Sequence, residues 1–213
     1  MTTTDAPTNA PLAESPAPAG PGSPVADPAL IGVPTFLVGS IALGLVLTGY
    51  VPAAATGASI PIILAATAIG QLVAAVWAAS RDQNAVASVF GIFTGFWLSY
   101  ALLVLGLTND WFGIVADDAV ATQKLFLLTW LVVIVLLTVA SLRLPLAFTV
   151  LFALIDLALL FVFLGTSNAS TSQTSIGGYF VFSFVVVGAY LFLDAMSRST
   201  GGRGLPLGRA IVR

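Results

Sequence analysis

The sequence contains no cysteine and no histidine, and only 8% of its 213 residues are charged. Without cysteine there is no disulfide and no thiolate nucleophile, and without histidine the common zinc and haem ligand sets are excluded. The net charge is −2 and no basic surface is evident, so we expect no nucleic-acid partner. No carboxylate pair, glycine-rich phosphate loop or nucleophile beside a base occurs, so we expect no enzyme, no cofactor and no metal site.

What the chain has instead is apolar surface. Hydrophobic residues make up 58% of the sequence, and the mean hydropathy is +1.05. A soluble domain of this size with so few charged residues would not stay dispersed in water. We therefore predict an integral membrane protein in a lipid bilayer. Several apolar stretches of about 18 residues or more favour helices, because barrel strands would be short and alternating.

These stretches predict an all-α integral membrane protein, a six-transmembrane-helix bundle with a disordered N-terminal tail. The expected helices are 31–50, 60–79, 85–107, 123–142, 146–164 and 176–196. Polar loops are expected between them, the two longest at 108–122 and 165–175, and both are rich in residues that favour turns.

The ends of the chain differ in composition from this transmembrane region, which we place at residues 27–197. Residues 1–26 are rich in Pro, Ala, Thr and Ser and have no basic residue, which predicts a disordered tail. Residues 198–213 contain four arginines and are expected to form a basic cytoplasmic tail.

The distribution of positive charge predicts the orientation. Six spans put both termini on one side, and that side then holds Arg81, Arg143 and the four tail arginines. The opposite side holds only Lys124. The positive-inside rule therefore predicts a multi-pass protein of the cell membrane with both termini cytoplasmic. Arg143 is interpreted as a topology anchor.

Few polar side chains lie at membrane depth. Asp156 is near the middle of the fifth helix, where a carboxylate is costly and is by default a functional candidate. It is either a proton site in coupled transport or a hydrogen bond to a neighbouring helix. Gln71 in the second helix is either a bond between helices or a polar contact in a permeation route. Asp194 is interpreted as an interfacial residue.

The stretch from Phe90 to Tyr100 combines five aromatic residues with two glycines, Gly91 and Gly95. Glycines four residues apart form a face on which another helix can approach closely. The stretch is therefore either a helix-packing face with an aromatic end near the interface or part of a helix that lines a narrow route.

From Asp27-Pro28-Ala29-Leu30-Ile31-Gly32 onward the chain resembles the acetate uptake transporter family. Members of that family have six transmembrane helices and transport acetate and succinate. That family begins its first helix with Asn-Pro-Ala-Pro-Leu-Gly-Leu, of which Pro28, Ala29 and Gly32 are kept. Further matches follow in the same order. They are Gln71, Phe96-Trp97-Leu98, Thr149-Val150-Leu151-Phe152-Ala153-Leu154, Gly178-Tyr179, Ala189-Tyr190 and Leu205-Pro206-Leu207-Gly208.

The resemblance implies an acetate or monocarboxylate permease, with succinate as a possible second substrate, assembled as a homo-oligomer (a hexamer). It also implies a hydrophobic constriction, which falls by position on Phe36, Phe93 and Phe148. Its substrate-binding residues would be Asp27, Pro28, Ala29, Gly32, Gln71 and Trp97, and a helix start at Asp27 to Gly32 would offer free N–H donors to a carboxylate. An ionised Asp27 would repel the same anion.

This resemblance leads us to expect a permease that is either proton-linked or channel-like. Proton linkage would lower the free-energy cost of crossing an apolar constriction, because an anion that moves with a proton is electrically neutral. Two other functions stay open. One is a membrane structural or assembly protein that transports nothing, and the other is a channel for another small solute such as ammonium or water.

Overall fold

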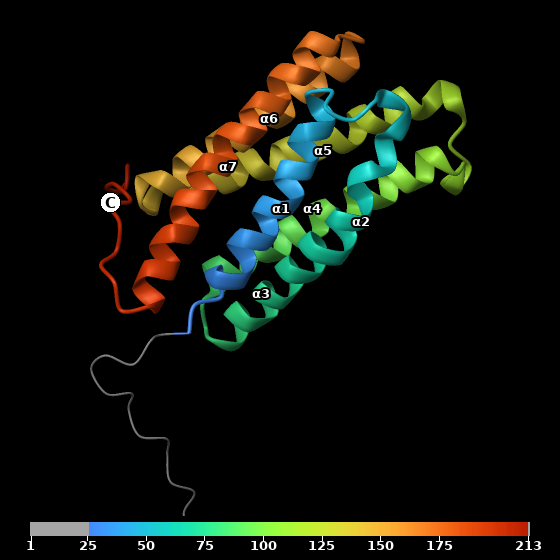
Figure 1. Ribbon diagram of the computed structural model, residues 1–213. Helices are drawn as coiled ribbons and strands as arrows, with labels where there is room; N and C mark the ends of the chain where they lie inside the picture. Colours follow the sequence, from blue (N-terminus) through green and yellow to red (C-terminus); the bar gives the residue numbers. More distant parts are fainter. Residues whose placement is uncertain (1–25, 213) are drawn as a thin grey trace, which may run out of the picture.

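The computed structural model describes residues 26–212, apart from the side chains of residues 53, 54 and 56. Within this part of the chain, six helical spans are long and apolar enough to cross a membrane. The predicted all-α membrane bundle of six helices is thereby confirmed, and Figure 1 shows the spans lying side by side. The tail expected at residues 1–26 lies, but for its last residue, outside the described residues.

The spans are close to the predicted positions. Five of them are α1 (Ala29–Leu47), α4 (Asn84–Thr108), α5 (Ala119–Ala140), α6 (Leu146–Ser167) and α7 (Thr171–Ser199). The second span is composite, and it runs through η1 (Ala53–Ser59), α2 (Ile60–Ile62), η2 (Ile63–Ala68) and α3 (Ile69–Ser80). Of these, η1 is a tight 3₁₀ segment and η2 a wide π segment. Short 3₁₀ turns lie between α4 and α5, at η3 (Trp111–Gly113) and η4 (Ala116–Asp118), and between α5 and α6, at η5 (Ser141–Arg143).

The spans form a closed ring. In order around it, α5 contacts α6, α6 contacts α7, α7 contacts α1, α1 contacts α3 and η2, α3 contacts α4, and α4 contacts α5. The buried hydrophobic cluster draws residues from all six spans. Such a ring has an interior that every span can line, and the candidate site lies there.

Small residues let the spans approach closely, as two of their contacts show. A Cβ on Gly39 of α1 would lie 2.4 Å from the hydroxyl oxygen of Thr67 in η2. A Cβ on Gly177 of α7 would lie 2.6 Å from a methyl group of Val162 in α6. Any larger side chain at either glycine would push the two helices apart, which is how small residues act in membrane bundles.

The prediction of a loop at 165–175 is wrong in its length: the loop is shorter, because only residues 168–170 separate α6 from α7. The hydroxyls that suggested a loop bond instead to helix backbone. Ser170 accepts a hydrogen bond from the N–H of Gln173 and so caps α7, and Thr166 donates to the carbonyl of Val162 at 2.9 Å. Serine and threonine can cap a helix or bond back to its previous turn, so their number alone does not decide between loop and helix.

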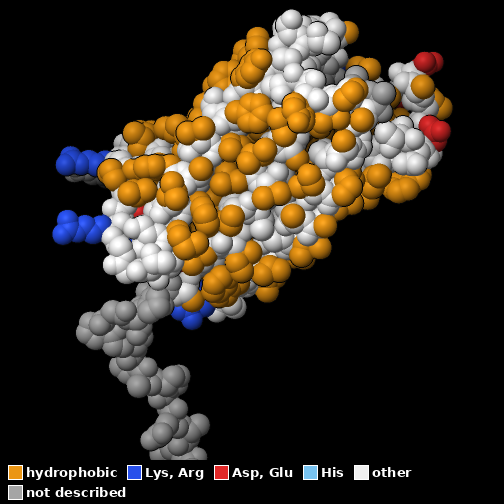
Figure 2. All heavy atoms as spheres, in the orientation of Figure 1, with side chains coloured by type: hydrophobic (Ala, Val, Ile, Leu, Met, Phe, Trp, Pro, Cys, Tyr) orange, Lys and Arg blue, Asp and Glu red, His pale blue; other side chains and the backbone are white. Residues whose placement is uncertain are grey.

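Charge lies at the two ends of the bundle. Figure 2 shows apolar side chains over the flanks, Lys and Arg side chains at the end where α7 finishes, and Asp and Glu side chains at the opposite end. Helix α1 begins and α7 finishes at the same end of the molecule (Figure 1), which we name the terminal side. The opposite end is named the far side.

The basic C-terminal tail folds back across the terminal side. The amide of Ala147 donates to the carbonyl of Leu207, and the amide of Ile211 donates to the carbonyl of Leu142, each at 3.0 Å. Asp194, expected at an interface, is buried near the end of α7 and forms an ion pair with Arg198 at 3.0 Å. It also accepts a hydrogen bond from the amide of Leu205 at 2.6 Å, so it fixes the start of the tail.

Candidate functional site

Two cavities lie inside the ring, one toward each end. The far-side cavity has a volume of about 570 Å³ and is lined along α1 by Phe36, Leu43, Val46 and Leu47. The terminal-side cavity has a volume of about 310 Å³ and is lined along α1 by Ala29, Val33 and Phe36. Phe36 and Phe93 belong to the walls of both. The two cavities therefore lie end to end along the bundle, with these two rings between them.

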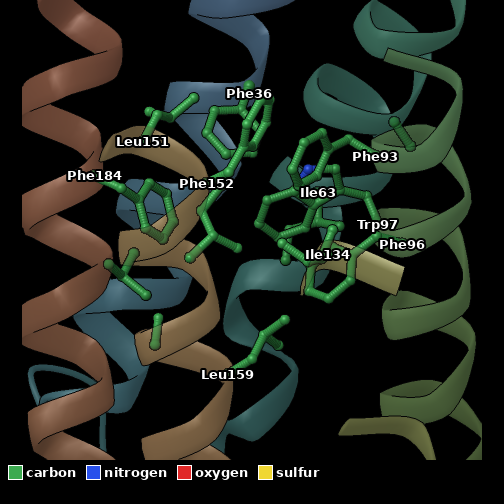
Figure 3. Packing of buried hydrophobic residues seen from close by; sticks show 14 of the residues in the cluster. Phe36, Ile63, Phe93, Phe96, Trp97, Ile134, Leu151, Phe152, Leu159 and Phe184 are labelled. Atoms are coloured by element: carbon green, nitrogen blue, oxygen red, sulfur yellow. The ribbon is translucent and has the colours of Figure 1, made fainter. Parts of the chain in front are cut away.

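Aromatic rings close the point where the cavities meet. Phe36 and Phe93 are in edge-to-face contact, with ring centroids 4.9 Å apart. Phe152 stacks on Phe93 with a distance of 6.3 Å between the ring centroids, and the ring centroids of Phe184 and Phe36 lie 5.6 Å apart. Figure 3 shows these rings, which come from α1, α4, α6 and α7, pointing toward one another. We refer to Phe36, Phe93, Phe152 and Phe184 as the aromatic constriction.

Of the predicted constriction residues, the structure brings Phe36 and Phe93 together and places Phe148 elsewhere. Phe148 is half-buried and lines the terminal-side cavity. Phe152 lies one helical turn further along α6, and it is the α6 ring that stacks on Phe93. A role for Phe148 in the constriction stays a prediction.

Phe152 and Phe184 were missed by sequence reasoning. The spacing of four residues from Phe148 put Phe152 on the same helix face and could have indicated it. Nothing in the sequence singled out Phe184, because α7 also contains Phe180, Phe182 and Phe192.

Gln71 of α3 is fully buried and lines the terminal-side cavity. Its amide nitrogen donates to the carbonyl oxygen of Gly32 and to the hydroxyl of Thr35, the latter at 3.3 Å. Both acceptors belong to α1, so the interpretation of Gln71 as a bond between helices agrees with its geometry. Its amide oxygen is buried and has no hydrogen-bond partner among the described residues.

The expectation of free N–H donors at the start of α1 is wrong. The carboxylate of Asp27 accepts from the amide of Ala29 at 2.9 Å, and the carbonyl of Asp27 accepts from Leu30 at 3.1 Å. The carbonyl of Pro28 accepts from Ile31 at 3.1 Å and from Gly32 at 2.9 Å. The aspartate that replaces the family's asparagine therefore caps its own helix, and the first turn has no amide left for an anion.

Of the other residues predicted to bind substrate at this end, only some line the terminal-side cavity. Asp27 and Ala29 line it, and Pro28 is fully buried. Gly32 packs under the ring of Phe90, where a Cβ would lie 2.2 Å from the ring. A substrate-binding role for these residues stays a prediction.

Trp97 lies on the far side of the constriction. Its indole is 1% exposed, contacts the ring of Phe36 with centroids 6.2 Å apart, and forms part of the far-side cavity wall. The indole N–H has no partner among the described residues. Polar side chains appear further out in the same wall, where they include Thr108, Gln123, Thr166 and Thr174.

Asp156 of α6 lines neither of these cavities. Its Oδ2 lies 2.7 Å from the hydroxyl of Thr138 in α5, and its Oδ1 has no partner among the described residues. This geometry favours a hydrogen bond between α5 and α6 over a place on the route. Proton coupling by Asp156 stays a prediction.

The two glycines of the predicted packing face have different surroundings. A Cβ on Gly95 would lie 3.4 Å from the indole of Trp130 in α5, which is an ordinary contact. A Cβ on Gly91 would meet nothing within 4 Å. Close packing at Gly91 is therefore not formed within the described part of this chain.

Three comparisons with known proteins bear on the fold and the family. The model of the GPR1/FUN34/yaaH family matches residues 13–201. Among solved structures, the chain is similar to that of the bacterial acetate channel SatP. The TM-score is 0.76 at 18% identity, over 86% of this chain and 99% of that one. No curated protein matches the chain.

Proposed function

Because the chain belongs to the GPR1/FUN34/yaaH family, whose model matches residues 13–201, we propose that it is a membrane permease. Its proposed substrate is acetate or a related short monocarboxylate, with succinate as a possible second substrate. The observation that carries the proposal is the pair of cavities that meet at Phe36 and Phe93. The fold shared with the acetate channel SatP supports the choice of substrate class.

The proposed route enters one cavity, passes the aromatic constriction and leaves through the other. The constriction is apolar, so a small solute must shed its water there, and an unpaired charge is strongly disfavoured. Rings at the narrowest point also limit the width of what passes. Transport that is proton-linked or channel-like for a small substrate is consistent with both properties.

We propose that the permease lies in the cell membrane with both termini cytoplasmic. The distribution of Lys and Arg supports this orientation, because Arg81, Arg143 and the tail arginines all lie at the terminal side of the spans. Cleavage of the C-terminal tail by protease added outside intact cells would contradict this orientation.

We further propose a homo-oligomer, a hexamer by family resemblance. Gly91 is exposed in the single chain and has open space over it, which suits a helix contributed by a second copy. The mass of the detergent-purified complex tests this, and a monomeric mass would contradict it.

The transport proposal is tested by uptake of labelled acetate into liposomes that contain the purified protein. We expect uptake faster than into protein-free liposomes, and we expect propionate and succinate to compete with acetate. Well-folded protein that leaves uptake at the protein-free rate would refute the acetate permease. Ammonium and water would then be the next solutes to test.

A further inference from the structure

The C-terminal tail is held against the end of α5. The amides of Ile211 and Val212 both donate to the carbonyl of Leu142, each at 3.0 Å. Leu142 is the second-last residue of the fourth span, which ends at Arg143. Figure 1 shows the tail running from the end of α7 along this end of the bundle. These backbone bonds therefore hold the last part of the tail where the fourth span leaves the membrane.

The side chains at this place are apolar and face outward. Ile211 is 58% exposed, Val212 is 42% exposed, and Leu146, at the start of α6, is 41% exposed. Gly208 brings the tail onto α6, because a Cβ on this glycine would lie 2.8 Å from the Cβ of Leu146. Apolar side chains held at the end of a span gain free energy by entering the border between lipid headgroups and acyl chains. We name Leu146, Ile211 and Val212 the tail patch, and it suits a lipid surface better than water.

Two exposed arginines border the tail patch. Arg143 directly follows Leu142 in the chain, and Arg209 directly follows Gly208. Arg209 is two residues from Ile211, so the Cα atoms of these two residues lie at most about 7 Å apart. An arginine side chain can lay its apolar stem along such a patch and keep its charged end in the polar layer. Both guanidinium groups are therefore within reach of one headgroup beside the patch.

Neither arginine is neutralised by the protein. Within residues 26–212, the ion pair that the structure shows joins Asp194 to Arg198, and no carboxylate in this part of the chain pairs with Arg143 or Arg209. A guanidinium group binds phosphate oxygens through paired hydrogen bonds. A free anion would use the two arginines and leave the tail patch uncovered. A phospholipid fits both features, because its phosphate is joined to acyl chains.

We propose that Arg143, Arg209 and the tail patch form a binding site for an anionic phospholipid of the leaflet at the terminal side. The arginines bind the headgroup, and Ile211 and Val212 contact the upper part of the acyl chains. A zwitterionic lipid also has a phosphate, but its ammonium group offsets the attraction, so the site prefers a lipid with net negative charge. The inference goes beyond the proposed transport function and does not depend on which solute crosses.

The test measures lipids bound to the full chain by native mass spectrometry in detergent. Phosphatidylglycerol and phosphatidylcholine with the same acyl chains are added in equal amounts. The ratio of the two bound lipids is read in one spectrum, so the amount of folded protein cancels. We expect the unchanged protein to bind phosphatidylglycerol in preference. Equal binding of the two lipids would overturn the inference, whether or not the protein transports acetate.

Charge-removing variants locate the site. Arg143→Gln combined with Arg209→Gln should lower the preference for phosphatidylglycerol, by about fivefold for each arginine removed. The matched control combines Arg81→Gln with Arg203→Gln, which removes the same charge from two other exposed positions at the terminal side. We expect the control to stay within about twofold of the unchanged protein, because distant charges are screened. An equal fall in both double variants would show a diffuse charge effect and overturn the inference.

Two further measurements separate a lipid from a free anion. Ile211→Ser keeps every charge and removes apolar contact, and we expect bound phosphatidylglycerol to fall about threefold or more. Inorganic phosphate in about tenfold excess over the lipid should displace less than half of the bound phosphatidylglycerol. Complete displacement by phosphate, or unchanged lipid binding by the Ile211→Ser variant, would assign the arginines to a free anion and overturn the inference.

Discussion

At the scale of the residue, two phenylalanines that belong to one predicted constriction have different surroundings. Phe93 touches the rings of Phe36 and Phe152 and belongs to the walls of both cavities. Phe148 is a half-buried part of one wall. We therefore expect the width of the proposed route to depend on Phe93 and not on Phe148.

This difference predicts how selectivity responds to substitution. Phe93→Ala widens the narrowest point, and we expect the uptake rate of butyrate relative to acetate to rise about tenfold or more, as expected when a pocket gains room for extra methylene groups. Phe148→Ala should leave this ratio unchanged. The ratio is compared within each preparation of liposomes, so differences in the amount of folded protein cancel. An equal rise in both variants would place Phe148 in the constriction.

Some of these residue contacts could be predicted from the sequence and others could not. Phe36 and Phe93 were placed in a constriction by their position in the family resemblance, and Gln71 was expected either to bond between helices or to contact a permeant. The capping of α1 by Asp27 was not, because the choice between a free and an occupied helix start depends on the rotamer of one side chain. Phe184 gave no signal, since its ring is one of several on α7 and only packing decides which points inward.

At the scale of the element, each helix is positioned by the residues that meet its neighbours. The lengths of the first, second, third and fifth spans follow from hydropathy and agree with the structure within about four residues. The fourth and sixth spans, 116–143 and 171–199, are longer than predicted, because polar and hydroxyl-bearing residues at their starts are also helical. The short turn between α6 and α7 was not predicted, because its Ser and Thr hydroxyls satisfy helix backbone instead of water. Likewise, the glycine pair on α4 suggested a packing face, while closer approaches, such as those at Gly39 and Gly177, lie on other helices.

The two kinds of glycine predict opposite effects on stability. Gly177→Ala places a methyl group 2.6 Å from Val162, and we expect a loss of about 1–3 kcal/mol in stability because the core is overpacked. Gly91→Ala meets nothing within 4 Å in this chain and removes a flexible residue from a helix. Within a single chain we expect it to be neutral or to gain up to about 1 kcal/mol, whereas a second copy packed on Gly91, as proposed for the oligomer, would make the substitution destabilising. Unfolding midpoints in detergent measure both, and a destabilising Gly91→Ala would indicate a contact with a second copy.

At the scale of the whole molecule, the ring of six spans encloses two cavities that meet at an apolar contact between Phe36 and Phe93. The cavities on either side of that contact differ in chemistry. The far-side wall contains the Trp97 indole and several hydroxyls, whereas the polar side chains of the terminal-side wall are Gln71 and Asp27. The two cavities therefore offer different polar groups to a solute.

The central claim is that the solute passes Phe36, and the absence of cysteine from the sequence allows a direct test. A single Phe36→Cys variant is modified with a thiol reagent that forms a mixed disulfide, and labelled acetate uptake is measured before modification, after it and after reduction. Ile41→Cys, on an exposed position of the same helix, is the matched control. We predict that modification at position 36 brings uptake to the protein-free rate, that reduction restores it, and that modification at position 41 changes nothing. Undiminished uptake by the fully modified Phe36→Cys variant would contradict a route through the aromatic constriction.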